Sequence, residues 1–232
     1  MNRTTLDERG IPVRRESGFK RALSWLPAAI LVLIIGGIVF AVFAFENSWW
    51  TADRPVASAD QQASDGMSTF TQPGLDFLTV QGYAKIKLRE NALPASELGL
   101  EADGAKEVEL LRPVQVRLLG EDDVVVVDLI DRLTITTEND TVTSVSLYPS
   151  GTNRYPDAIA LVRGLAPSVG WTESDILRLQ SQLADDARAS ETGQITAQLP
   201  VVTDSGLAVS ASFFVDVKAG YTIFSIDVAR PS

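Results

Sequence analysis

The chain contains no cysteine and no histidine among its 232 residues. The absence of cysteine excludes disulfides, thiolate nucleophiles and cysteine-based zinc or iron–sulfur sites. The absence of histidine removes the commonest general base and the commonest transition-metal ligand. Most familiar hydrolase and metalloenzyme mechanisms are therefore excluded, and catalysis would have to use Asp and Glu pairs, a Ser with a Lys, or a bound cofactor.

Positive charge is also scarce. The chain has 20 Lys and Arg against 30 Asp and Glu, which gives a formal net charge of −10. Nucleic-acid binders need clustered Lys and Arg to displace counterions from phosphates, so we expect no nucleic-acid partner. There is neither a G-x-G-x-x-G nor a G-x-x-x-x-G-K-[ST] motif, so nothing in the sequence supports nucleotide binding, and we predict no cofactor.

Apolar residues are concentrated in one run, residues 22–45, which contains 24 consecutive positions without a charge. At 1.5 Å per residue this run is about 36 Å long as a helix, slightly more than the roughly 30 Å hydrocarbon core of a bilayer. Lys20 and Arg21 precede it and Trp49 and Trp50 follow it, as is typical of interfacial anchors. We therefore expect a transmembrane helix over residues 22–45 that contacts the lipid bilayer.

The distribution of charge predicts the orientation of this helix. Residues 1–23 carry a net charge of +3 and the remainder carries −13. Because Lys and Arg are retained on the cytoplasmic side, residues 1–21 should be a cytoplasmic tail and the rest of the chain extracytoplasmic. A cleaved signal peptide is the alternative, although the run is longer than the roughly 7 to 15 residues of a signal h-region.

After the apolar run, residues 46–74 are predicted to be a flexible tether. From Thr51 onward this segment is rich in Ala, Ser, Asp, Gln and Gly and shows neither helical nor strand periodicity. Such a composition is typical of a linker. The remaining residues, 75–232, are expected to form the extracytoplasmic domain.

Strand patterns dominate the first half of this domain. Residues 84–89 and 114–118 alternate between apolar and polar side chains, which indicates half-buried strands. Residues 124–130 form a nearly continuous apolar run, which favours a central strand buried on both faces. Residues 133–137 and 141–148, separated by a Glu-Asn-Asp turn, predict a hairpin.

Two helices are expected next. Pro156 can begin the first helix, which Pro167 would end or distort in its last turn. The second helix carries an N-terminal capping box, with Thr172 as N-cap and Asp175 three residues later, and a hydrophobic staple between Trp171 and Ile176.

Alternating strands over residues 195–199, 207–217 and 222–228 complete the chain. This order of elements predicts an α+β fold in which a two-helix segment packs on one face of an antiparallel sheet. The pattern leaves open whether residues 75–232 are one domain or two subdomains, 75–150 and 155–232.

No catalytic or metal site emerges from the remaining motifs. The carboxylates of 121–123 and of 185–186 are adjacent in sequence, and adjacent side chains diverge in both strands and helices, so we expect solvated acidic groups. The acidic turns at 120–123 and 138–140 lack the spacing of a calcium loop. A Ser-x-x-Lys match at 17–20 lies in the predicted tail, without a pocket that would lower the pKa of a lysine.

These observations favour a non-catalytic, single-pass membrane protein of a bacterial cell envelope, whose extracytoplasmic domain binds another envelope protein or a wall component. One alternative is a transmembrane sensor or regulatory subunit, which would act through a separate cytoplasmic partner because 21 residues are too few for an output domain. A less favoured alternative is an enzyme that acts on glycans with carboxylates alone. Neither the oligomeric state nor the identity of the partner follows from the sequence.

Overall fold

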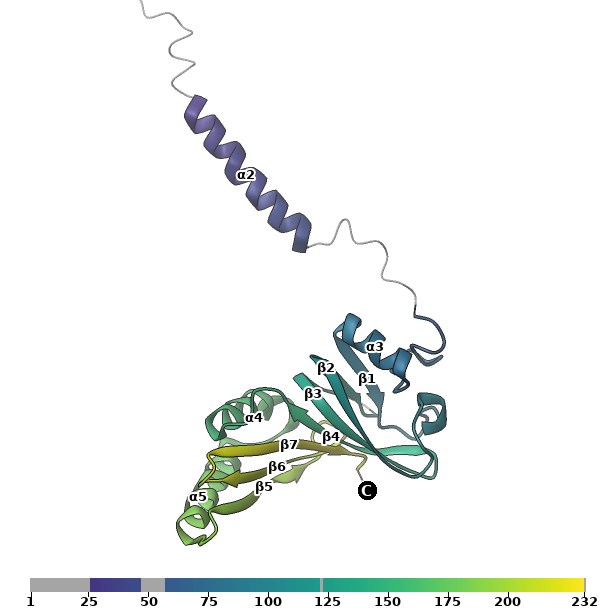
Figure 1. Cartoon of the computed structure of the whole chain (residues 1–232), viewed down its shortest axis with the longest axis vertical. Coiled ribbons are helices and arrows are strands. Elements are labelled where there is room, and N and C mark those ends of the chain that lie inside the picture. Colours follow the sequence, from purple (N-terminus) through teal and green to yellow (C-terminus); the bar gives the residue numbers. More distant parts are fainter. Residues whose placement is uncertain (1–25, 47–56, 122, 232) are drawn as a thin grey trace, which may run out of the picture. The chain divides into compact units, whose positions relative to one another are not determined.

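The computed structural model describes residues 26–46, 57–121 and 123–231, and it is drawn in Figure 1. It divides the chain into two compact units, 1–56 and 57–232. In the first unit α2 (Leu26–Glu46) is helical, and its large apolar side chains are exposed wherever they are described, Leu33 to 75%. Taken over the described residues, no helix is long and apolar enough to cross a membrane.

The second unit is built on one seven-stranded sheet with the strand order β1-β2-β3-β4-β7-β6-β5. Its strands are β1 (Tyr83–Lys87), β2 (Gly104–Leu119), β3 (Val124–Glu138), β4 (Thr141–Pro149), β5 (Gln194–Val202), β6 (Ala208–Asp216) and β7 (Tyr221–Ala229). Its helices are α3 (Gln72–Gln81), the short 3₁₀ helix η1 (Ala95–Leu98), α4 (Tyr155–Val169) and α5 (Glu173–Ala189). With α2, the described residues therefore contain four α-helices and a mixed sheet, and the predicted α+β class is confirmed.

The sheet is mixed, so the prediction of an antiparallel sheet holds for every strand pair of the described residues except β1 with β2. The edge strand β1 runs parallel to β2, with Ala84 opposite Val116, whereas the other strand pairs are antiparallel. A parallel pair needs a crossover of a dozen or more residues. Residues 88–103, which contain η1, are long enough to return the chain to the start of the next strand.

The predicted boundary between tether and domain was also wrong, because residues 57–74 fold against the sheet. Met67 and Phe70 are buried. The Ser68 N–H donates to the Lys85 carbonyl (3.0 Å), and the Lys85 N–H donates to the Ser68 hydroxyl (2.9 Å), so this segment covers the free edge of β1. The polar composition of the segment concealed these two core side chains.

Residues 124–130 form the start of β3 but are not buried on both faces as predicted. Val125, Val127 and Ile130 are buried, whereas Val124 and Val126 are exposed. The apolar run therefore follows the alternation of a strand with one solvent-facing side, and two of its valines lie on that side.

Local signals in the sequence gave the correct turns and caps. The hairpin between β3 and β4 turns at Asn139 and Asp140, whose φ angles of 51° and 56° suit a type I′ turn. At α5 the Asp175 N–H donates to the Thr172 hydroxyl (3.3 Å) and the Thr172 N–H donates to the Asp175 carboxylate (3.0 Å), so the capping box is confirmed. Helix α4 continues two residues past Pro167 before Gly170 ends it.

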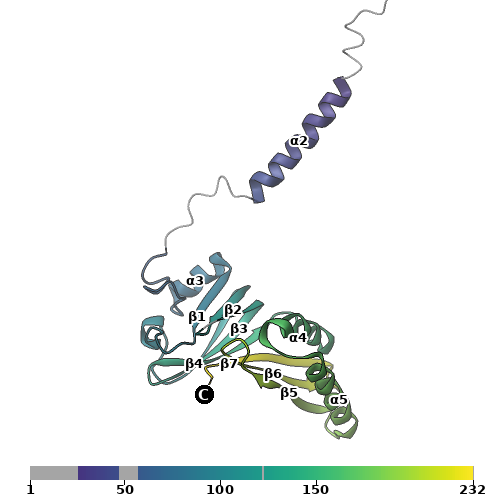
Figure 2. The ribbon, with the colours of Figure 1, turned by 180° about the vertical axis from the view of Figure 1, so that it is seen from behind.

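Helices α4 and α5 lie beside the β5–β7 part of the sheet, as Figure 2 shows from behind. Ile176, Leu179 and Leu183 of α5 are buried in the same core as the inward side chains of β5. The opposite face of these strands carries Ser, Thr and Gln side chains together with Phe214, Tyr221 and Ile223, and it remains open. The packing of α5 on β5 positions the cavity described next.

Candidate functional site

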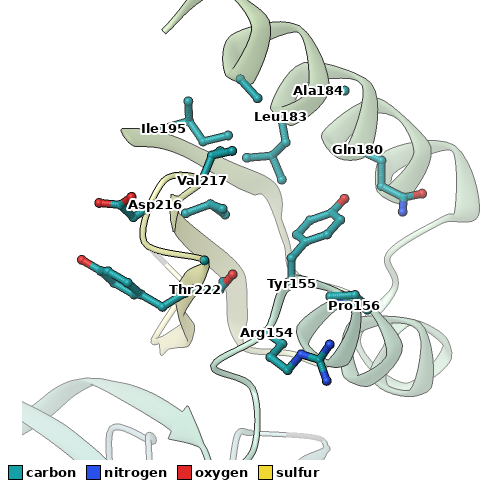
Figure 3. A pocket seen from close by; sticks show the side chains of 14 residues that line it. Arg154, Tyr155, Pro156, Gln180, Leu183, Ala184, Ile195, Asp216, Val217 and Thr222 are labelled. Carbon is teal, nitrogen blue, oxygen red and sulfur yellow. The ribbon is translucent and has the colours of Figure 1, made fainter. Parts of the chain in front are cut away.

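An apolar cleft opens where the start of α4, the middle of α5 and the turn between β6 and β7 meet (Figure 3). Its volume is about 370 Å³, within the range of ligand-binding cavities. The residues that line it are Arg154, Tyr155, Pro156, Gln180, Leu183, Ala184, Ala187, Ile195, Val215, Asp216, Val217, Gly220, Tyr221 and Thr222. Most of them are apolar or aromatic, so the cleft is suited to apolar groups.

The floor and the rim of the cleft differ in exposure. Leu183, Ile195 and Thr222 are buried and form its base. Val217, in the β6–β7 turn, is 52% exposed, whereas the Tyr221 ring lies on the face of the sheet opposite to the buried Thr222 and is near the ring of Phe214. A large apolar side chain on a rim loses contact with water only when something covers it, so the rim at Val217 is a candidate contact surface.

The hairpin that carries the rim is fixed by Asp216. Its carboxylate accepts a hydrogen bond from the Ala219 N–H (2.8 Å), and its carbonyl accepts one from Gly220, which has a φ of 73°. The hydrogen bond from Ala219, followed by the one from the Gln194 amide, lowers the pKa of Asp216 below its ordinary value. The Lys218 ammonium holds the turn from outside by donating to the Glu191 carbonyl (2.6 Å).

Charge at the mouth of the cleft comes mainly from Arg154. Its side chain is exposed, and no described carboxylate lies within ion-pair distance of it. The lining contributes one carboxylate, Asp216, whose oxygens already accept hydrogen bonds from the Ala219 N–H and the Gln194 amide. Glycoside hydrolysis uses two carboxylates that face one substrate, and the lining of this cleft does not present such a pair.

Two of the acidic groups considered from the sequence, Asp140 and Asp185, hold parts of the fold together. Asp140 accepts hydrogen bonds from the N–H (2.8 Å) and the hydroxyl (3.0 Å) of Ser96 and so holds η1 on the β3–β4 turn. Asp185 pairs with Arg188 along α5 (2.5 Å). The described residues contain no cluster of three or more acidic side chains able to hold a metal. The Ser-x-x-Lys match at 17–20 and Asp122 lie outside the described residues.

Trp171 is buried, and its indole N–H donates to the Pro200 carbonyl of β5 (3.0 Å). Ile176, its predicted staple partner, is buried in the same core. The indole therefore belongs to the joint between α5 and β5, and it does not line the cleft.

Sequence reasoning missed both the cleft and a polar cluster on the open face of the sheet. In this cluster the Asp227 carboxylate accepts hydrogen bonds from the hydroxyls of Ser146 (2.6 Å), Ser212 (3.0 Å) and Ser225 (3.3 Å). The four residues come from three strands, β4, β6 and β7, so their proximity depends on strand order. The one local signal at the cleft was Val217, an apolar residue in a tight turn, where side chains are usually exposed.

Comparison of the chain with protein-family models, with curated proteins and with solved structures gives no match.

Proposed function

We propose that the chain is a non-catalytic, membrane-anchored binding protein of a bacterial cell envelope, and that its cleft receives an apolar segment of another envelope protein. The observation that carries this proposal is the cleft itself, with Leu183 and Ile195 buried in its floor and the exposed apolar side chain of Val217 at its rim. A partner that inserts an apolar group would bury Val217 together with the floor.

The anchor in this proposal is the uncharged run of residues 22–45. Exposed Leu, Ile and Val side chains over α2 are costly in water and favourable in lipid. The net charge of +3 on one side of this run and −13 on the other supports a cytoplasmic N-terminus.

The anchor and its orientation are tested by single cysteines, because the chain has none of its own. Thr5→Cys lies in the proposed tail, and Thr192→Cys is exposed in the folded unit. In protoplasts, a membrane-impermeant maleimide should label Thr192→Cys at once and Thr5→Cys only after lysis. Equal labelling of both before lysis, or release of the chain by alkaline carbonate, would contradict the anchored topology.

Binding at the cleft is tested by photo-crosslinking in intact cells. A photoreactive benzophenone amino acid at Val217, on the rim, should trap a discrete partner band, whereas the same group at Thr192 should not. Ala184→Glu places a charge in the cleft and should abolish this band. Ser181→Glu adds the same charge to an exposed position of α5 outside the lining and should leave the band unchanged. No band at Val217 above that at Thr192 would refute the proposal.

A further inference from the structure

The strand β5 forms one edge of the sheet, and its hydrogen-bonding groups can be assigned from the register. The Val217 N–H donates to the Gly193 carbonyl (2.8 Å), and this pair continues the ladder in which Gln194 lies opposite Asp216. In an antiparallel ladder hydrogen-bonded pairs recur at every second residue. Ile195, Ala197 and Leu199 therefore turn their backbone groups to β6, whereas those of Gln194, Thr196 and Gln198 point away from the sheet.

The contacts of Gln194 support this assignment. Its N–H donates to the Thr192 hydroxyl (3.2 Å) and its carbonyl accepts from the Ser190 hydroxyl (3.1 Å), so both groups face away from β6. For the next outward-facing residues, Thr196 and Gln198, no described residue bonds to the backbone N–H or carbonyl. Both residues are exposed.

Between Ile195 and Leu199 the described residues place no charge, proline, bulge or covering segment on this edge. Proteins protect edge strands with charges, with proline, with bulges or with a covering segment. The other edge, β1, is covered by Ser68. By contrast, β5 has no charged residue over its whole length, Gln-Ile-Thr-Ala-Gln-Leu-Pro-Val-Val, and its Pro200 and its bulge come only after Leu199. The stretch 195–199 is therefore open to another strand.

We propose that this edge pairs with β5 of a second copy of the chain, antiparallel, with the two-fold axis at Thr196. The outward-facing groups then bond Thr196 to its own copy and Gln198 to Gln194 of the partner. For this second pair the N–H and carbonyl of Gln194 exchange their bonds with the Thr192 and Ser190 hydroxyls for bonds with the other strand. The resulting cross-strand side-chain pairs are Thr with Thr and Gln with Gln, which hydrogen-bond without like-charge repulsion. Near a two-fold axis, a charged residue would face the same charge on the other copy. The β5 strand carries no charge, so this repulsion does not arise there.

The open stretch is short, so the interface belongs to the small, weakly binding class. The exposed residue Gln182 on α5 borders the same groove as Thr196 and Gln198. Self-pairing is independent of the cleft function proposed above, because the cleft is lined by Ile195 on the inner face of β5 and the edge groups are not part of it.

The register is tested by cysteine crosslinking of the purified full chain under mild oxidation. Opposed residues of a hydrogen-bonded pair have Cα atoms about 5.5 Å apart, within the range of a disulfide. Thr196→Cys should therefore shift to a band of twice the monomer mass. Gln198→Cys alone should remain monomeric, and a mixture of Gln198→Cys with Gln194→Cys should form the mixed dimer. Ser181→Cys, exposed on α5, is the control for collisional crosslinking.

Two further variants show whether the dimer depends on the edge. Thr196→Pro removes an N–H that faces away from β6, and Thr196→Lys places a charge against its own copy. Each should abolish crosslinking between Gln194→Cys and Gln198→Cys while far-UV circular dichroism stays unchanged. The proposal is overturned if Thr196→Cys crosslinks no more than Ser181→Cys, if Gln198→Cys alone dimerises equally well, or if Thr196→Cys is captured in cells only by a different protein.

Discussion

Replacing Gly74 with alanine tests whether residues 57–71 are part of the folded unit. A methyl group at this position of α3 would lie 2.3 Å from the Thr69 carbonyl oxygen and 2.3 Å from the Thr69 hydroxyl, where ordinary contacts begin at 3.4 Å. The backbone at Thr69 would therefore have to move by about 1 Å. Such a shift disturbs the hydrogen bonds that Thr69 (3.2 Å) and Thr71 (3.0 Å) donate to the Asp60 carbonyl.

The cost of this overpacking is about 1–3 kcal/mol, and the better helix propensity of alanine offsets less than about 1 kcal/mol of it. For a domain of this size each kcal/mol lowers the melting temperature by about 2–4 °C, so the remaining cost of up to about 3 kcal/mol should lower the melting temperature of Gly74→Ala by up to about 12 °C.

The matched control is Gly164→Ala in α4, where the added methyl group meets no atom within 4 Å. This variant gains helix propensity without a clash, so its melting temperature should rise by about 1–4 °C. Thermal unfolding followed by far-UV circular dichroism, together with trypsin digestion at 25 °C, measures both variants. If Gly74→Ala melts at or above the wild-type temperature, residues 57–71 do not pack as described.

Three further predictions concern caps, strain and the joint between α5 and β5. The hydrogen bond from the Thr172 hydroxyl, followed by that from its N–H, lowers the pKa of Asp175 below its ordinary value of 3.8. The ionised Asp175 carboxylate therefore stabilises the folded state fully above pH 3.8, and this stabilisation is lost as the pH falls through the lower pKa of the folded state. The melting temperature should consequently fall more between pH 5 and pH 3 in the wild type than in Asp175→Asn. Leu129 has a φ of 60° and is 58% exposed, so Leu129→Gly should relieve left-handed strain and stabilise the protein by about 0.5–1 kcal/mol in urea titrations. Trp171→Phe keeps an apolar ring but loses the bond to the Pro200 carbonyl and should cost about 1 kcal/mol in the same titrations, whereas no loss would show that this bond is not formed.

Patterns that depend on neighbours in the sequence were predictable. The alternation of apolar and polar residues located part of most strands, although β2 begins at Gly104, well before the predicted residues 114–118. The Thr172 capping box located the start of α5, because it arises within a few residues. The turn at Asn139 and Asp140 was likewise correct, since these residue types tolerate a positive φ.

Features that depend on strand order were not predictable. The parallel placement of β1 follows from how residues 88–103 cross the sheet, and composition does not encode that path. Residues 57–71 looked like a linker because two core side chains, Met67 and Phe70, are diluted among polar ones. The cleft joins residues 154–156 with 215–222 through the pairing of β6 with β7 and the packing of α5, so no local window contains it.

The negative charge of the chain affects where two copies can approach each other, and the uncharged edge of β5 is such a place. The chain after residue 23 carries a net charge of −13, so two copies repel each other in most orientations. Contact is least unfavourable where neither surface contributes a charge, and β5 provides such a stretch in a strand whose outward N–H and carbonyl groups at Thr196 and Gln198 can pair. Salt screens the repulsion over about 10 Å at 0.1 M and leaves backbone hydrogen bonds nearly unchanged. Raising the salt concentration should therefore strengthen crosslinking through Thr196→Cys, whereas an interface held by ion pairs would weaken.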